Sequence, residues 1–281
     1  MPRKMLRKRR LQGSGRMRIA LVIAASAGLA AAPAAAETVR TNGVELEYRV
    51  SGAGAPLLLL HGFGSCIDHS WGALIPKLAM THRVIAVNMR GHGLSTNPTG
   101  VYTHAQTAED INGMLDALGI AKADAIGFSS GGMTLLHLAT RHPDRLSKMV
   151  VVGATTHFGD QARAIMNEVA ARGLPPPVHE QFVTCAKRGD AQVRGLIRQF
   201  GAFKDSRTDM NFKATDLARI KAETLIVHGD RDEFFPVSIP VAMYEAIPKA
   251  RLWIVPGGSH EPTAGASSAT FMETVEQFLS R

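Results

Sequence analysis

The 281-residue chain has ordinary apolar and charged fractions, 45% and 20%, which excludes collagen-like, low-complexity and disulfide-scaffold proteins. Its formal net charge of +8 arises at one end. Eight of the 32 basic residues and no acidic residue lie in residues 1–36, which leaves 24 basic against 24 acidic residues in 37–281. The charge therefore gives no indication of binding to nucleic acid or to an anionic membrane.

Residues 1–36 have the pattern of a secretory signal peptide. Basic residues come first, and the apolar run 19–31 that follows is too short to span a bilayer as a helix. Small residues at 34 and 36 then form an A-x-A exit. We expect cleavage after Ala36, export to the periplasm or the medium, and no stable membrane anchor afterwards. An uncleaved anchor is the alternative, and Met17 is an alternative start.

The rest of the chain alternates between two apolar patterns. Runs of strand length occupy 45–50, 56–60, 83–87, 123–126, 149–152, 225–227 and 252–255. Apolar residues at helical spacing occupy 71–80, 107–118, 132–142, 239–246 and 270–279. Such alternation predicts βαβ units, that is, an α/β fold with a mostly parallel sheet and helices on both faces. In such sheets the functional residues lie at the carboxyl ends of the strands.

The alternation stops between the two parts of this core, 37–156 and 216–281. Residues 157–215 have helical patterning and no convincing strand, so we expect them to form a helical cap over the site. Aromatic and methionine side chains follow this segment: Phe158, Met166, Phe182, Phe200, Phe203, Met210 and Phe212. We expect most of them to pack the cap onto the core and a minority to line the pocket.

Gly127-Phe128-Ser129-Ser130-Gly131 lies between a predicted strand and a predicted helix, which is the setting of a G-x-S-x-G nucleophile elbow. The serine of such an elbow sits on a very tight turn, where a Cβ atom at either flanking glycine would clash. Its hydroxyl lies at a helix N-terminus, whose dipole favours a developing anion. Ser129 is therefore the candidate nucleophile, and Ser130 is a rival only through adjacency.

A serine hydroxyl needs a base, and eleven histidines compete for that role. His260 directly follows the last predicted strand, at the same sheet edge as Ser129. His61, His92 and His228 are each followed by glycine and suit structural roles in loops. We therefore predict that His260 is the base.

The base in turn needs a carboxylate that orients it. Asp230 and Asp232 follow the strand at 225–227, and the chain order serine, aspartate, histidine is that of α/β-hydrolases. We choose Asp232, because Asp230 lies in the tight turn and suits backbone capping. Glu233 ranks third.

An oxyanion formed at the substrate carbonyl needs two donors. The backbone N–H of Ser130, the residue after the nucleophile, is one candidate. The other is the N–H of Phe63 in His61-Gly62-Phe63-Gly64, where the glycines let the loop fold over the serine.

These segments resemble the α/β-hydrolase superfamily over essentially all of residues 37–281. Further matching motifs are Arg90-Gly91-His92-Gly93 and Gly258-Ser259-His260. The Gly-Phe-Ser-x-Gly-Gly form looks like the esterase, enol-lactonase and cofactor-free perhydrolase branches. The resemblance implies an eight-stranded, mostly parallel sheet with a helical cap after the sixth strand.

The resemblance also separates this chain from other enzymes. Haloalkane dehalogenases and epoxide hydrolases have aspartate where this chain has Ser129, and no H-E-x-x-H pattern indicates a metal hydrolase. We therefore expect neither cofactor nor metal. The leading hypothesis is hydrolysis of a small carboxylic ester through an acyl-enzyme.

Several alternatives share these residues. Lactone, thioester or amide cleavage and perhydrolysis use the same triad, and a binding or signalling protein could keep it with negligible turnover. Cys66 and Cys185 could pair in an oxidising compartment, or could remain as two thiols.

Overall fold

The computed structural model describes residues 35–263 and 265–280. The predicted signal peptide, except for its last two residues, lies outside the described residues. In the described part of the chain, no helix is long and apolar enough to cross a membrane.

The strands and helices alternate along most of the chain. The strands are β1 (Glu37–Thr41), β2 (Val44–Ser51), β3 (Ala55–Leu60), β4 (His82–Val87), β5 (Ala123–Phe128), β6 (Leu146–Val152), β7 (Glu223–Gly229) and β8 (Ala250–Val255). The helices are α1 (Ile67–Trp71), α2 (Ile75–Leu78), α3 (His104–Ala117), α4 (Ser130–Arg141), α5 (Asp160–Arg172), α6 (Pro176–Cys185), α7 (Asp190–Ala202), α8 (Ala214–Leu217), α9 (Ser238–Ala246) and α10 (Ser268–Ser280). Two short 3-10 helices, η1 (Phe203–Asp205) and η2 (Gly265–Ser267), complete the described secondary structure.

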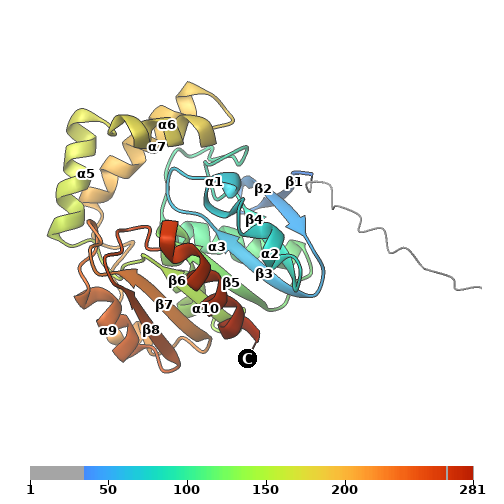
Figure 1. The fold of residues 1–281 in the computed structure, drawn as a ribbon. Coiled ribbons are helices and arrows are strands. Elements are labelled where there is room, and N and C mark those ends of the chain that lie inside the picture. Colours follow the sequence, from blue (N-terminus) through green and yellow to red (C-terminus); the bar gives the residue numbers. More distant parts are fainter. Residues whose placement is uncertain (1–34, 264, 281) are drawn as a thin grey trace, which may run out of the picture. The chain divides into compact units, whose positions relative to one another are not determined.

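The eight strands form one sheet in the order β1-β2-β4-β3-β5-β6-β7-β8 (Figure 1). β1 and β2 pair antiparallel, as do β2 and β4, whereas every pair from β4 to β8 is parallel. This sheet confirms the predicted fold class. The carboxyl ends of β3, β5, β7 and β8 therefore meet at one edge.

The apolar runs form strands because both faces of the sheet are covered. In β3, Leu58 and Leu60 face a core that also contains residues of α3, α4 and α9. Leu57 and Leu59 face a second core, built with α1, α2 and α10. Alternate side chains of a strand point to opposite faces, so a continuous apolar run supplies both cores.

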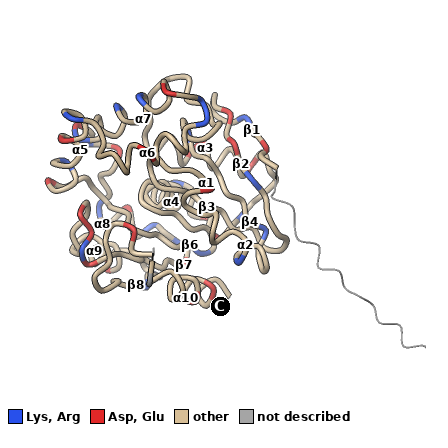
Figure 2. Tube along the Cα trace, turned by 45° about the horizontal axis from the view of Figure 1, so that its top comes forward, with Lys and Arg blue, Asp and Glu red and all other residues tan. Residues whose placement is uncertain are grey.

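The chain between β6 and β7 holds α5, α6, α7, η1 and α8. The yellow and gold helices α5, α6 and α7 lie together beyond the sheet (Figure 1). The Gln192 side-chain amide donates hydrogen bonds to the carbonyls of Gly91 and Gly93, at 2.7 and 2.9 Å, and so docks α7 on the loop after β4. Basic and acidic residues are interspersed along these helices (Figure 2), in line with the balanced charge of residues 37–281.

Two elements differ from the sequence-based prediction. The first strand, β1, has no counterpart in the prediction, because its short and mostly exposed sequence carries no apolar alternation. The helix predicted over 71–80 is wrong: α1 ends at Trp71, and α2 starts at Ile75. Pro76 lies in the first turn of α2, where its missing N–H needs no partner. In the middle of a continuous helix it would remove a backbone hydrogen bond and clash with the carbonyl of the preceding turn.

Candidate active site

Ser129 lies in the turn between β5 and α4, with φ +50° and ψ −116°. A positive φ is rare for a residue with a side chain, and its cost is of the order of 1–3 kcal/mol. A Cβ atom at Gly131 would overlap the Leu60 carbonyl oxygen, and one at Gly127 would lie 2.5 Å from the Gly131 carbonyl carbon. The two glycines therefore allow the tight turn that presents the Ser129 hydroxyl.

Ser129, His260 and Asp232 form a continuous hydrogen-bonded array. His260 Nε2 lies 2.9 Å from Ser129 Oγ, and His260 Nδ1 lies 3.0 Å from Asp232 Oδ2. The three residues follow β5, β8 and β7, and the carboxyl ends of these parallel strands bring them together although 131 positions separate Ser129 from His260. The arrangement can pass a proton from the hydroxyl to an oriented imidazole.

The Asp232 carboxylate is buried and held by further contacts. Its Oδ1 accepts hydrogen bonds from the backbone N–H groups of Phe234 and Phe235, at 2.8 and 3.0 Å. Burial alone would raise the pKa of Asp232, but the hydrogen bond and charge of His260, together with these amides, outweigh burial and lower it. His228 Nε2 also approaches Oδ2, at 3.5 Å. Asp232 is therefore kept ionised beside the imidazole.

The two acids that ranked behind Asp232 have backbone partners instead. Asp230 Oδ1 accepts from Gly257 N–H at 2.6 Å, and Glu233 Oε2 accepts from His260 N–H at 3.0 Å. Both contacts shape the loops that carry the array.

The two amides proposed for the oxyanion remain available. Within residues 35–263 and 265–280, neither the Phe63 N–H nor the Ser130 N–H donates a hydrogen bond to a protein group. The next amide, Gly64 N–H, donates to His92 Nε2 at 2.9 Å and fixes the loop. A substrate carbonyl oxygen placed between the two free donors would be stabilised as it gained charge.

His61 and His92 brace this loop as neutral imidazoles. His61 Nε2 accepts from Met89 N–H at 3.0 Å, as His92 Nε2 does from Gly64, so neither Nε2 carries a proton. Burial lowers the pKa of His61 to about 3 and that of His92 to about 4. These side chains thus have the structural roles that the sequence indicated.

Stability should fall as the pH falls from 7 to 5. Burial also lowers the pKa of His137 to about 4, so His61, His92 and His137 stay neutral in the folded state while the unfolded chain takes up protons below about pH 6.5. A histidine whose pKa is lowered on folding does not reduce stability above about pH 6.5. As the pH falls from there toward the pKa of the folded state, each such histidine lowers the free energy of unfolding by up to about 1.4 kcal/mol per pH unit. Burial raises the pKa of Asp110 and Asp124, which offsets part of the loss.

We expect the free energy of unfolding in urea to be several kcal/mol lower at pH 5 than at pH 7, because each of the three histidines contributes up to about 2 kcal/mol over this range. The same titrations on a variant with His179 replaced by alanine serve as the control, because His179 is exposed. An unfolding free energy that stays constant or increases would contradict the assignment of neutral buried imidazoles.

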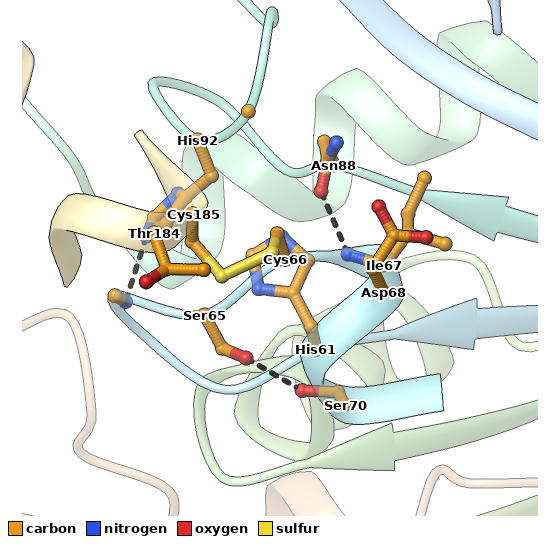
Figure 3. The surroundings of a disulfide bond; sticks show 12 residues. His61, Ser65, Cys66, Ile67, Asp68, Ser70, Asn88, His92, Thr184 and Cys185 are labelled. Carbon is orange, nitrogen blue, oxygen red and sulfur yellow. Dashed lines mark hydrogen bonds between the residues drawn. A yellow bond between two sulfur atoms is a disulfide. The ribbon is translucent and has the colours of Figure 1, made fainter. Parts of the chain in front are cut away.

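A disulfide between Cys66 and Cys185 joins the loop after β3, which carries Phe63, to the last residue of α6, with the two Cα atoms 5.3 Å apart (Figure 3). Both cysteines are buried. The Ile67 N–H donates to Asn88 Oδ1 at 3.0 Å and holds the chain just after Cys66. The bridge therefore connects the helices inserted after β6 directly to the loop that carries Phe63.

A cavity of about 450 Å³ opens beside Ser129. Most of its wall is apolar and is formed by Phe63, Phe128, Met133, Phe158, Ile165, Met166, Val169, Leu174, Pro175, Val178, Phe182, Phe200, Phe203, Phe234 and Phe235. Its charged lining residues besides histidines are Glu233 and Glu261, both exposed, and no described lysine or arginine lines it. The cavity is therefore suited to an apolar and uncharged group.

The expectation that a minority of the aromatic and methionine side chains of 157–215 line the pocket is wrong. Five of the seven line the cavity, and only Met210 and Phe212 do not. The reason is geometric: the cavity lies where the inserted helices meet the core, so the face that packs against the core also forms the wall.

His104 and Asp209 also belong to this region, and sequence patterns did not single them out. His104 lines the cavity, and its Nδ1 lies 2.7 Å from Asp209 Oδ2. No local motif connects residues that are 105 positions apart. Among the residues that the structure describes, no group of three His, Cys, Asp or Glu is placed to hold a metal ion.

Comparison with known proteins agrees with this geometry. The family described as the alpha/beta hydrolase fold matches residues 55–174. A putative carbamate hydrolase from Caulobacter sp. (strain K31) is 31% identical over 75% of this chain and 85% of its own length. The chain belongs to the α/β-hydrolase family.

Two further proteins cover more of this α/β-hydrolase. A 2-hydroxymuconate semialdehyde hydrolase from Pseudomonas putida is 28% identical over 88% of this chain and 95% of its own length. The crystal structure of a hydrolase from Pseudomonas aeruginosa is 28% identical and has a TM-score of 0.70, covering 88% of this chain and 98% of that one. The resemblance inferred from the motifs is thereby confirmed at the level of fold and of hydrolase family.

Proposed function

We propose that this α/β-hydrolase cleaves neutral carboxylic esters through an acyl-enzyme. The observation that carries the proposal is the apolar cavity of about 450 Å³ beside the hydrogen-bonded array of Ser129, His260 and Asp232. Such a cavity binds an apolar acyl group next to the attacking hydroxyl, at about 0.8 kcal/mol for each buried methylene.

The reaction follows from the hydrogen bonds. Ser129 Oγ attacks the ester carbonyl carbon as its proton passes to His260 Nε2, while Asp232 stabilises the imidazolium. The N–H groups of Phe63 and Ser130 hold the oxyanion. The carbon–oxygen bond then breaks, and His260 returns the proton to the leaving alcohol. Water attacks the acyl-enzyme by the same route and releases the acid.

The charge of the cavity favours a neutral ester over a carboxylate substrate. The Pseudomonas putida relative is named for a 2-hydroxymuconate semialdehyde, which is a carboxylate. In this chain the charged groups other than histidine at the cavity are two acids, Glu233 and Glu261, and no described cation lines it. An unpaired carboxylate moved from water into such a site costs several kcal/mol.

The proposal is tested with two esters that differ in one group. p-Nitrophenyl butyrate and p-nitrophenyl hemisuccinate share a four-carbon acyl group, and the second ends in a carboxylate instead of a methyl group. We expect kcat/KM to be at least about 100-fold higher for the butyrate, since an uncompensated charge costs several kcal/mol. We also expect kcat/KM to rise about fourfold per methylene from acetate until the cavity is full.

The Ser129→Ala protein is the background control, because p-nitrophenyl esters also hydrolyse spontaneously. Equal rates in both proteins would refute the serine mechanism. Faster turnover of the hemisuccinate would refute the preference for neutral esters and would favour carboxylate substrates.

A further inference from the structure

A second serine–histidine–aspartate array lies beside the proposed triad. Ser130 Oγ lies 3.0 Å from His104 Nε2, and His104 Nδ1 lies 2.7 Å from Asp209 Oδ2. Ser130, His104 and Asp209 are 3%, 0% and 7% exposed, so the array is enclosed in the protein. Ser130 and His104 nevertheless line the same cavity as Ser129. The array therefore faces the place where a substrate would lie.

The hydrogen bond between His104 and Asp209 has a defined direction. The Asp209 carboxylate also accepts from the backbone N–H groups of His104 and Ala105, at 2.9 and 3.0 Å. Burial opposes its charge, but the hydrogen bonds from His104 and from the two amides lower the pKa of Asp209 to about 2. An ionised carboxylate can only accept, so His104 Nδ1 donates to it. Whether His104 Nε2 accepts from the Ser130 hydroxyl or donates to it, at least one lone pair of Ser130 Oγ stays free to accept another hydrogen bond.

Ser130 Oγ consequently presents an acceptor to the cavity. Among the described residues the Ser130 side chain makes one hydrogen bond, to His104 Nε2, so a lone pair of its oxygen stays unused. The neighbouring wall is apolar, with the rings of Phe158 and Phe203 centred 6.1 and 5.3 Å from that of His104. A fixed acceptor in an apolar wall favours a ligand that brings a donor, because a ligand without one leaves the acceptor unpaired.

We propose that Ser130 Oγ accepts a hydrogen bond from a hydroxyl group of the substrate and so selects hydroxyacyl esters. This inference rests on the proposed function, in which the N–H of the same serine contacts the oxyanion. Since that N–H and the side-chain oxygen belong to one short residue, the selected hydroxyl lies within a few bonds of the scissile carbonyl. His104 and Asp209 are positioning residues, which hold the Ser130 side chain in place through the hydrogen bond to His104 Nε2.

The test compares p-nitrophenyl 3-hydroxybutyrate with p-nitrophenyl butyrate. We expect the ratio of their kcat/KM values to fall about tenfold in Ser130→Ala, the effect of losing one hydrogen bond of about 1.4 kcal/mol. Thr140→Val is the matched control: it removes another buried hydroxyl of α4, one that bonds the Leu136 carbonyl and does not line the cavity. That variant should keep the wild-type ratio.

The role of His104 has its own readout. In His104→Phe the Ser130 hydroxyl is retained but loses its hydrogen-bond partner, so the ratio should fall although the hydroxyl is present. The change should appear in KM for the hydroxy ester. If His104→Phe keeps the wild-type ratio of kcat/KM values for the two esters, His104 has no positioning role. If Ser130→Ala keeps that ratio, the whole inference is refuted.

A binding measurement tests this inference independently of the proposed function. Calorimetric titration of the uncleaved 3-hydroxybutyrate and butyrate esters into Ser129→Ala measures selection without turnover. We expect the affinity ratio to fall about tenfold when Ser130→Ala is added. If the wild type cleaves neither ester, the proposed function is refuted. The ratio of the two affinities then still shows whether Ser130 selects the hydroxyl group. If both are cleaved and the affinity ratio does not change, the inference alone fails.

Discussion

Replacing His260 with alanine is expected to lower kcat for p-nitrophenyl butyrate by about 10⁵- to 10⁶-fold, and Asp232→Asn by about 10⁴-fold. Alanine removes the base that accepts the Ser129 proton at 2.9 Å. The effect of asparagine is subtler and follows from two backbone contacts. Because Oδ1 accepts from the N–H groups of Phe234 and Phe235, the amide oxygen must stay on that side.

The amide nitrogen of the Asp232→Asn side chain then faces His260 Nδ1 and donates to it. The imidazole proton is thereby moved to Nε2, the atom that must accept from Ser129. The measurement is steady-state kinetics on the variants, with His179→Ala as control because that histidine is exposed and does not line the cavity. The double variant Ser129→Ala/His260→Ala should lose no more activity than either single variant. Retention of more than about 1% of kcat in His260→Ala would exclude His260 as the base.

Removing the Cys66–Cys185 disulfide is expected to lower the free energy of unfolding by about 4 kcal/mol. The bridge closes a loop over a sequence separation of 119, and long loops lose the most chain entropy when they are cross-linked. The measurement is urea unfolding of the oxidised protein and of the variant Cys66→Ala/Cys185→Ala. Alanine is chosen because both sites are buried and a serine hydroxyl would add an unpaired polar group.

Oxidised protein treated with a reductant should unfold at the same urea concentration as the alanine variant. A midpoint shared by the oxidised and reduced proteins would show that the bridge contributes nothing to stability.

Disulfides persist in oxidising compartments, so the bridge supports the proposal that the protein is exported. The bridge also ties α6 to the loop that carries Phe63, and we therefore expect the alanine variant to lose ester hydrolysis at a lower temperature than the wild type.

The features that sequence predicted well are those encoded over short stretches of chain. A continuous apolar run such as Leu57–Leu60 predicts a strand that is buried on both faces. The glycines on either side of Ser129 predict a turn too tight for side chains at their positions. Parallel strands then place the residues after β5, β7 and β8 at one edge, which is why chain position alone could select His260 and Asp232.

The features that sequence did not predict depend on contacts between distant segments. Asp209 meets His104 only because the inserted helices fold back onto the start of α3. The pairing of Cys66 with Cys185 depends in the same way on where α6 comes to lie, and the sequence left both states open. The number of side chains from the inserted helices that line the cavity likewise depends on how closely these helices approach the sheet and its flanking helices.

The disulfide also simplifies the oxidative folding of this protein. Cys66 and Cys185 are the two cysteines of the chain, so a single intramolecular pairing exists and no mispaired isomer can form within one molecule. Maturation therefore requires a thiol oxidant but no isomerase that reshuffles disulfides. Cys185 follows β4, β5 and β6 in the chain, so the bond can close only after these strands have been synthesised. The bond therefore forms only when these three strands are already present in the chain.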